Sequence, residues 1–187
     1  MDIKKIESRP ELMDAIRGIK EGADRSTKKV LADTDMTFFR GVATWVGFVN
    51  GIPVTLNSTH FGKRKSGIWE PYSNYYIAVT RMENRRQGYA RELNTYVEEL
   101  AIKTGCIRVK ALDGTRLGVL FTQGLGLDVW GLTDKNDLIV DSPLVFDGRF
   151  PESVTPKTAK KWTNRITPLT KEEIEFVLNN VKFRYDE

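Results

Sequence analysis

The chain has 187 residues, enough for one domain with a full core or for one domain with an extension. Hydrophobic residues make up 40% and charged residues 29%, a composition typical of soluble globular proteins that excludes a disordered chain. No apolar run approaches the roughly 20 residues that a membrane-spanning helix needs, and no apolar segment follows the N-terminal lysines as in a secretory signal. We therefore expect a cytoplasmic protein with no membrane partner.

The charge and the rare residues narrow the choice of ligands. A formal net charge of +4 mildly favours anionic partners. Cys106 is the only cysteine and His60 the only histidine. One cysteine excludes an intramolecular disulfide, and this pair offers too few ligands for a typical zinc site. We therefore predict no metal.

The first part of the chain predicts a strand, two helices and a β-hairpin. Ser8-Arg9-Pro10-Glu11 is a capping box with proline in the first turn, typical of a helix start. Asn50-Gly51 between two β-rich runs is a strong signal for a hairpin turn. The predicted bounds are a strand at 2–6, a helix from Ser8 to Gly22, a helix at about 27–39, and strands at 43–49 and 52–56.

The second part predicts a loop followed by a strand, a turn and a helix. The polar and aromatic residues 60–74 are predicted to form the loop, and the apolar, β-branched residues 75–80 the strand. A helix then extends past Leu100 and ends near Gly105. The later predicted elements are a strand at 107–112, a helix at about 116–122, strands at 127–132 and 138–140, and a short helix opened by the capping box Thr170-Lys171-Glu172-Glu173.

The turn before the third helix contains Arg85-Arg86-Gln87-Gly88-Tyr89-Ala90. The first N–H groups of a helix have no partner within the helix, and the helix dipole is positive at this end. Gly88 allows the backbone to approach a ligand closely, and the arginines add positive charge. The turn is therefore predicted to bind an anion, most naturally a phosphate or pyrophosphate. The alternative is a glycine that only eases the start of a surface helix.

The string Arg85-x-x-Gly88-x-Ala90 after a strand resembles the Q/R-x-x-G-x-G/A turn of the GNAT superfamily of acyl-CoA-dependent N-acetyltransferases. The predicted order β-α-α-β-β-β-α-β-α-β-β resembles the GNAT fold over about residues 2–141. The resemblance implies an α/β (α+β) protein with a mixed, mostly antiparallel central sheet flanked by helices. We expect a GNAT-like acyltransferase domain at 1–141 and a C-terminal extension with a short helix at 142–187.

The resemblance also implies a cosubstrate and a reaction. Acetyl-CoA would donate the acyl group, and a primary amine would attack the thioester directly in a ternary complex. The strand backbone would pair with the pantetheine arm as an added strand does. A main-chain N–H on the same strand would hold the thioester oxygen. The residues implied to bind the cosubstrate are Ile77, Val79, Arg85, Arg86, Gln87, Gly88, Tyr89, Ala90, Arg91 and Phe121.

The chain departs from the family at the residue that protonates the leaving thiolate. GNAT proteins place a tyrosine there, shortly before a Gly-Phe pair, whereas Phe121 or Thr122 stands near that place here. Loss of a general acid typically slows a reaction about 100-fold to 10,000-fold. Tyr72, Tyr75 and Tyr76 are candidate replacements, with packing in the strand as the alternative.

An attacking amine must be neutral, so a base or a water chain is expected near the acceptor. The candidates are Glu70, Glu83 and His60, with a solvated carboxylate or a structural histidine as the alternative. Glu70 lies between Trp69 and Pro71, where partial burial would make it a stronger base. The predicted catalytic residues are Glu70, Tyr72 and Tyr76.

The acceptor is predicted to contact the basic, aromatic loop at 60–76. Lys63-Arg64-Lys65 followed by aromatic rings is a combination that binds phosphodiesters and stacks on bases. The acceptor amine would therefore belong to a small molecule or a macromolecule, nucleic acid included. The predicted acceptor-binding residues are His60, Lys63, Arg64, Trp69 and Tyr75.

Other functions stay open on these residues. The basic loop is also compatible with a solvated surface or with a nucleic-acid-binding or nucleic-acid-modifying protein. The absent tyrosine is compatible with a catalytically degenerate GNAT-fold protein that keeps the coenzyme A site. The extension would close an acceptor channel, add structure or form an oligomer contact.

Overall fold

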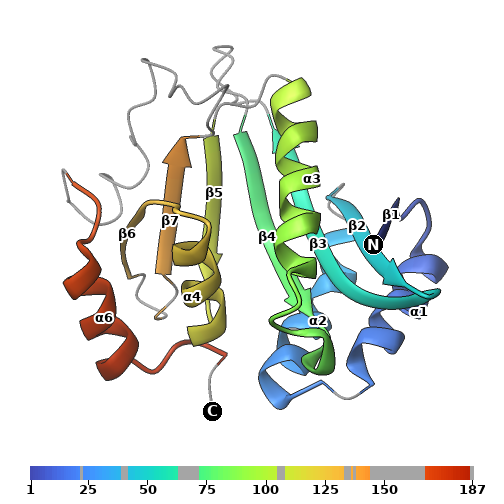
Figure 1. The fold of residues 1–187 in the computed structure, drawn as a ribbon, viewed down its shortest axis with the longest axis horizontal. Helices are drawn as coiled ribbons and strands as arrows, with labels where there is room; N and C mark the ends of the chain where they lie inside the picture. Colours follow the sequence, from blue (N-terminus) through green and yellow to red (C-terminus); the bar gives the residue numbers. More distant parts are fainter. Residues whose placement is uncertain are drawn as a thin grey trace.

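A mixed sheet runs through the described part of the chain, with helices on both faces (Figure 1). The computed structural model describes residues 1–21, 23–38, 42–62, 72–104, 108–132, 136, 138–143 and 167–185. For residues 33–38, 60, 62, 72–78, 108–113, 138–139 and 141–143, it describes the backbone alone. The elements are β1 (Asp2–Lys5), α1 (Arg9–Lys20), α2 (Arg25–Phe38), β2 (Ala43–Val49), β3 (Ile52–Gly62), β4 (Tyr72–Thr80), the 3₁₀ turn η1 (Met82–Asn84), α3 (Tyr89–Lys103), β5 (Arg108–Asp113), α4 (Arg116–Gly124), β6 (Val129–Leu132), β7 (Leu138–Pro143) and α6 (Lys171–Asn180).

The sheet has the strand order β1-β2-β3-β4-β5-β7-β6 in the described residues. Every neighbouring pair is antiparallel except β4 and β5, which are parallel. Two parallel neighbours need a crossover connection, and the segment that contains α3 provides it. The predicted element order and the mixed, mostly antiparallel sheet are therefore confirmed.

The two faces of the sheet bury different helices. Val46 of β2 packs in a cluster with Ile16 of α1 and Leu31 of α2. Its neighbour Trp45 packs instead with Leu93 and the rest of the buried face of α3. Adjacent residues of a strand point to opposite faces. The helices α1 and α2 therefore cover one face and α3 covers the other, as Figure 1 shows.

The C-terminal segment packs against α4 and β6. Phe183 is almost fully buried in a cluster with Val119 of α4, Val129 of β6 and two residues of α6, Ile174 and Leu178. The backbone N–H of Leu169 donates to the carbonyl of Val129 at 2.6 Å, and that of Tyr185 donates to the carbonyl of Gly114 at 2.8 Å. These contacts attach α6 to the sheet edge at which β6 lies. The proposed domain boundary at residue 141 stays a prediction.

Several local signals acted as expected. Ser8 and Thr170 both form complete capping boxes, with Glu11 and Glu173 respectively. Asn50 and Gly51 have φ angles of 50° and 77°, and two positive φ angles in succession are characteristic of a tight type I′ hairpin turn. The helical face predicted in the first helix is buried, namely Leu12, Ala15, Ile16 and Ile19.

The predicted loop at 60–74 is wrong at both ends, because β3 continues to Gly62 and β4 begins at Tyr72. The polar residues Asn57, Ser58 and Thr59 are fully buried inside β3. Their side chains form hydrogen bonds to other buried polar groups, so the loss of apolar character does not end the strand.

The second helix begins two residues earlier than predicted. Asp24 accepts a hydrogen bond from the backbone N–H of Thr27 at 2.7 Å and thereby caps the helix. The predicted helix ends at Gly22 and Gly105 lie outside the described residues. None of the described helices combines the length and the apolar character needed to cross a bilayer.

Candidate functional site

The strands β4 and β5 are paired along only part of their length. Their parallel ladder begins at Tyr72 and Arg108 and ends at Tyr75 and Ala111. In the described residues, β4 has no ladder partner on this side from Tyr76 to Thr80, although β3 pairs with its other edge. Figure 1 shows the two strands diverging toward the end of β4 that leads into the turn before α3. Within the described residues, this edge is therefore open, with backbone groups free of a ladder partner, as strand-like pairing with a ligand requires.

A β-bulge marks the point where the strands separate. Ser58 of β3 lies opposite Ile77, but Thr59 lies opposite Tyr75. Tyr76 is thus an extra residue in β4, and it directly follows the last residue paired with β5. Bulges bend a strand and increase its twist, and they recur beside active sites. The bulge accounts physically for the divergence of β4 from β5.

The turn between β4 and α3 has a specialised backbone. Arg86 has a φ angle of 63° and Gly88 one of 85°. The left-handed conformation costs a non-glycine residue about 1–2 kcal/mol, so such strain in a turn is a reason to look for function. A Cβ on Gly88 would meet no heavy atom within 4 Å. The conformation, and not crowding, therefore requires glycine at this position.

The first turn of α3 has no side-chain cap. Gly88 is the N-cap residue, and no side-chain hydrogen bond caps the helix there. The helix dipole and the uncapped N–H groups that follow Gly88 favour an anion at this end. The side chains of Arg86 and Arg91 are exposed and add positive charge. The physical conditions predicted for an anion site are present in this turn.

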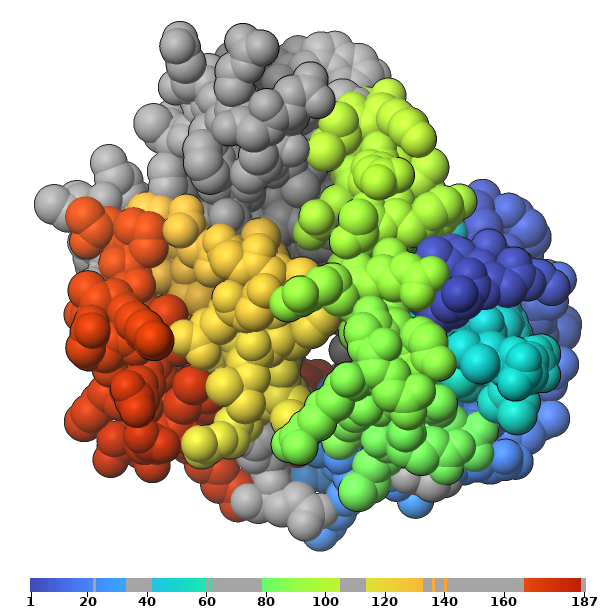
Figure 2. All heavy atoms as spheres, in the orientation of Figure 1, coloured from blue at the N-terminus to red at the C-terminus, as the bar shows by residue number. Residues whose placement is uncertain are grey.

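The opposite wall of the site is formed by α4. Arg91 Nη2 donates to the carbonyl oxygen of Gly124 at 3.0 Å and so joins the first turn of α3 to the end of α4. Figure 2 shows a hollow between α4, in yellow, and the turn before α3, in green. Phe121 of α4 is half-buried, and its neighbour Thr122 is only 4% exposed. Neither of these side chains is a tyrosine.

Arg85 lies behind the turn, in contact with α2. Its guanidinium donates to Asp24 Oδ2 at 2.7 Å, to Thr27 Oγ1 at 2.6 Å and to the carbonyl oxygen of Thr80 at 3.4 Å. Burial raises the pKa of Asp24, but hydrogen bonds from Arg85 and Thr27 and the charge of Arg85 outweigh burial and hold this pKa below its ordinary value. Asp24 is therefore a charged partner for Arg85 at neutral pH.

The remaining predicted cosubstrate-binding residues lie along β4 and the turn. Gln87 is exposed, and its Nε2 donates to the carbonyl of Glu83 at 3.1 Å. The side chain of Val79 is buried against α1 and α2, so only its backbone faces the open edge of the strand. Ile77 lies on the same unpaired stretch, and Tyr89 and Ala90 form the start of α3.

The predicted catalytic and acceptor-binding residues are placed less completely. The backbones of Tyr72 and Tyr75 lie where β4 is paired with β5, Tyr76 is at the bulge, and the backbone of His60 is opposite Asn74. Glu70, Lys63, Arg64 and Trp69 lie outside the described residues, so their roles stay predictions. Glu83, another candidate base, is exposed, and its Oε1 lies 2.8 Å from Arg81 Nε in an ion pair.

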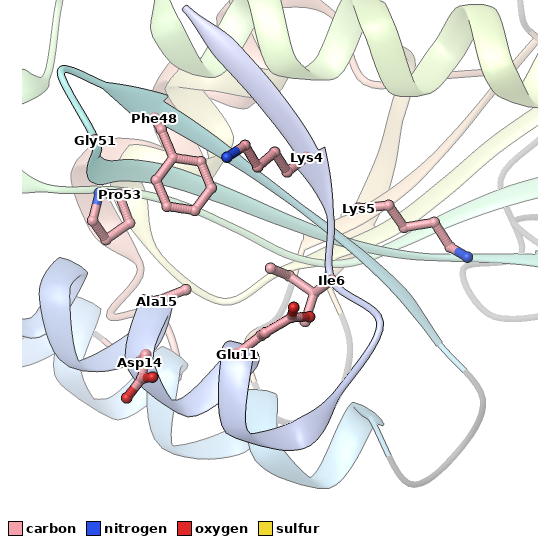
Figure 3. A pocket seen from close by; sticks show the side chains of 9 residues that line it. All are labelled: Lys4, Lys5, Ile6, Glu11, Asp14, Ala15, Phe48, Gly51 and Pro53. Atoms are coloured by element: carbon pink, nitrogen blue, oxygen red, sulfur yellow. The ribbon is translucent and has the colours of Figure 1, made fainter.

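A separate hollow of about 330 Å³ lies between α1, β1 and the turn of the β2–β3 hairpin (Figure 3). Lys4 and Phe48 both line the hollow, and Lys4 Nζ lies over the Phe48 ring, 5.5 Å from its centre. The Glu11 carboxylate there already accepts the backbone N–H groups of Glu7 and Ser8. None of the predicted site residues lines this hollow. Within the described part of the chain, no group of three His, Cys, Asp or Glu residues is arranged to hold a metal ion.

Two features of the site were missed from the sequence. One is the contact of Arg85 with Asp24 and Thr27, for which Asp24, three residues before Thr27, was an available helix-capping signal. The other is a buried hydrogen bond of 2.6 Å from Asn57 Nδ2 to Asn94 Oδ1, which joins β3 to α3. Asn94 interrupts the apolar face of a helix, and a polar residue there signals a buried partner.

Comparison with known proteins identifies the fold. No protein-family model matches the chain, and no curated protein matches its sequence. A PaiA N-acetyltransferase of Thermoplasma acidophilum in complex with coenzyme A matches with a TM-score of 0.58 and 13% identity, over 76% of this chain and 99% of that one. A putative GNAT acetyltransferase of Desulfovibrio desulfuricans matches with a TM-score of 0.61 and 11% identity, over 77% and 99% of the two chains.

A third match is an enzyme that acts on a protein. The ribosomal-protein-S18-alanine N-acetyltransferase of Escherichia coli has a TM-score of 0.57 and 13% identity, over 82% of this chain and 98% of that one. Identities this low establish the fold, and the element order and the mixed sheet described above agree with it. Over 76–82% of its length, this chain therefore has the fold of the GNAT N-acetyltransferases.

Proposed function

We propose that this protein is an acyl-CoA-dependent N-acyltransferase that uses acetyl-CoA and transfers the acyl group to a primary amine. One observation carries the proposal: the open edge of β4, from Tyr76 to Thr80, leads directly into a turn that ends at the uncapped start of α3. Coenzyme A has an extended amide-containing arm joined to a pyrophosphate. The edge of β4 corresponds to the extended arm, and the start of α3 that follows it corresponds to the pyrophosphate.

The two parts of the ligand match two kinds of backbone group. The pantetheine amides pair with β4 around Ile77 to Val79 in the manner of an added strand. The pyrophosphate accepts the N–H groups from Gly88 to Arg91, and the helix dipole stabilises its charge. The coenzyme A bound by the Thermoplasma acidophilum N-acetyltransferase, which has the same fold, supports this assignment.

The reaction proceeds by direct attack. A neutral amine nitrogen forms a bond to the thioester carbonyl carbon, and the carbon–sulfur bond breaks as the thiolate leaves. The amine loses a proton to Glu70 or to a water chain, and the thiolate gains one. A main-chain N–H near the bulge at Tyr76 stabilises the negative charge that develops on the carbonyl oxygen. Because Phe121 cannot donate a proton, Tyr72, Tyr76 or water supplies it.

A second candidate function is a GNAT-fold protein that binds coenzyme A without catalysis. It is favoured by one specific observation, the phenylalanine and the buried Thr122 on α4 near the place of the usual tyrosine. The two functions share the cosubstrate site and differ only in turnover. Measurement of thiol release therefore separates them.

The first experiment is calorimetric titration of the wild-type protein and two glycine variants with acetyl-CoA and with coenzyme A. Gly88→Val places a β-branched residue at a positive φ angle and blocks the approach of the pyrophosphate. Loss of two charge-assisted hydrogen bonds, at about 1.5 kcal/mol each, weakens binding by about 100-fold. Unchanged affinity of Gly88→Val would show that the turn does not bind the ligand.

The matched control is Gly51→Val in the β2–β3 turn. Gly51 has a φ angle of 77°, and a Cβ there would also meet no heavy atom within 4 Å. Both variants therefore carry the same backbone strain of about 1–2 kcal/mol. Only Gly88→Val is expected to lose ligand affinity, so equal losses in the two variants would indicate general destabilisation.

Thiol release with a panel of primary amines tests turnover. Binding with amine-dependent release of one thiol per acyl group transferred establishes the transferase. Binding with no release across small amines, peptide N-termini and nucleotide amines supports the protein that binds without catalysis. The same panel gives the class of acceptor, since each amine is assayed separately.

A further inference from the structure

Arg85 joins three elements at one point of the structure. Its guanidinium donates from Nη1 to Asp24, from Nη2 to Thr27 and from Nε to the carbonyl of Thr80, the last residue of β4. Asp24 and Thr27 belong to the start of α2, which packs on the face of the sheet opposite α3. The contact therefore passes the end of β4 and connects the start of α2 to the turn before α3.

The contact is built from both sides. Asp24 accepts the Thr27 backbone N–H with Oδ1 and Arg85 with Oδ2, both at 2.7 Å, so its carboxylate is held by the helix that it caps. The side chains of Arg85 and Asp24 are only 25% and 32% exposed. Each nitrogen of the Arg85 guanidinium donates to a protein oxygen, and its charge is balanced by Asp24. This arrangement directs Arg85 toward α2.

The turn that Arg85 begins is the strained part of the anion site. Arg86 follows directly with its φ angle of 63°, and Gly88 follows with 85°. The backbone N–H of Arg85 donates to the carbonyl of Met82 at 3.2 Å, so backbone and side chain both hold this residue. A turn held in its binding conformation before the ligand arrives loses less entropy when the ligand binds.

We propose that Arg85 is a positioning residue of the coenzyme A site, which acts on the pyrophosphate through Asp24 and Thr27 of α2 and does not contact it. This inference rests on the proposed function. It makes Asp24, on the far side of β4, a determinant of ligand affinity without ligand contact. By thermodynamic reciprocity, coenzyme A binding stabilises the start of α2 to the same degree.

A double-mutant cycle tests the proposal. The wild-type protein, Arg85→Met, Asp24→Asn and the double variant are each titrated with coenzyme A by calorimetry at one salt concentration. Each single variant is expected to bind about 10-fold more weakly, and the double variant no more weakly than Arg85→Met alone. If Arg85 contacts the pyrophosphate directly, Asp24→Asn frees it and leaves affinity unchanged or increased, which would overturn the proposal.

The control variant is Arg17→Met. Arg17 forms an ion pair with Asp14 at 3.2 Å, and both side chains are more than 70% exposed. Like Arg85→Met, this variant removes one positive charge and one ion pair with an aspartate. Coenzyme A affinity is expected to change by less than about twofold, because charges on the surface are screened by salt. A loss equal to that of Arg85→Met would assign the effect to net charge and overturn the proposal.

Amide hydrogen exchange supplies a readout that a merely structural role would not change. In the wild-type protein, coenzyme A is expected to slow exchange at residues 25–31 of α2, and Arg85→Met is expected to abolish this slowing. Arg85→Lys keeps the charge with fewer donors and is expected to restore part of the affinity, which guards against misfolding of the methionine variant. An unchanged response in Arg85→Met overturns the proposal.

The cycle separates this inference from the proposed function. A wild-type protein that binds coenzyme A while the two substitutions act additively overturns only the role of Arg85. A wild-type protein that binds neither coenzyme A nor acetyl-CoA overturns the proposed function and this inference together.

Discussion

The α-helices in the described part of the chain begin in two different ways. Four helices of the described chain start at a side chain that accepts a hydrogen bond from the backbone of the same helix, whereas α3 starts at Gly88, which has no side chain to do so. The four capping residues are Ser8 for α1, Asp24 for α2, Thr115 for α4 and Thr170 for α6. Among these five α-helices, the one without a side-chain cap is α3, which follows the open edge of β4.

This difference separates helix starts that stabilise the fold from the one that is available to a ligand. A capping side chain satisfies N–H groups that would otherwise remain unpaired. At the start of α3 these groups, with the positive end of the dipole, stay available to an anion. The Arg85 side chain connects this turn to the start of α2.

The largest expected effect follows from placing a negative charge at the uncapped start. Gly88→Asp and Gly88→Asn have nearly the same shape, and both residues tolerate a positive φ angle. At about 5 Å and an effective dielectric of about 20, one charge contributes about 3 kcal/mol. Coenzyme A is therefore expected to bind Gly88→Asp about 100-fold more weakly than Gly88→Asn, measured by calorimetry. Equal affinities would place the pyrophosphate elsewhere.

A smaller effect, on stability and not on binding, is expected at the capped starts. Ser8→Ala and Thr170→Ala each remove a capping box and should lower the free energy of unfolding by about 1 kcal/mol. Urea denaturation monitored by circular dichroism measures this loss. Coenzyme A affinity should stay at the wild-type value in both variants. A tenfold loss of affinity in either variant would contradict the distinction between the two kinds of start.

The smallest effect is the pH dependence of the α2 start. The pKa of Asp24 lies below its ordinary value in the folded protein, so its contribution is present at pH values above about 4 and is lost as the pH falls through the lowered value. The wild-type protein should exceed Asp24→Asn in stability by less than about 1 kcal/mol at pH 6, since the ion pair is partly exposed. The difference should shrink toward pH 3 in urea titrations. A difference that grows on acidification would contradict the assigned sign.

The fold was predictable because its signals are local. The capping boxes at Ser8 and Thr170 and the Asn50-Gly51 turn each depend on residues within a few positions of one another. The turn at Arg85 to Ala90 was likewise found from its own residues. The errors occurred where distant residues decide: β3 continues through Asn57 to Thr59 because these polar groups find buried partners, one of them on α3.

By itself, the sequence determined the element order, most helix starts and the position of the turn before α3, since spacing, glycine and capping residues act over short distances. Only the tertiary structure decided where β4 separates from β5 and what Arg85 contacts. The bulge at Tyr76 depends on the register with β3. Arg85 and Asp24 are 61 residues apart, and no local preference selects that pair. The bulge depends on the pairing of two strands and the Arg85 contact on the placement of α2 beside the turn, and only the folded chain brings these parts together.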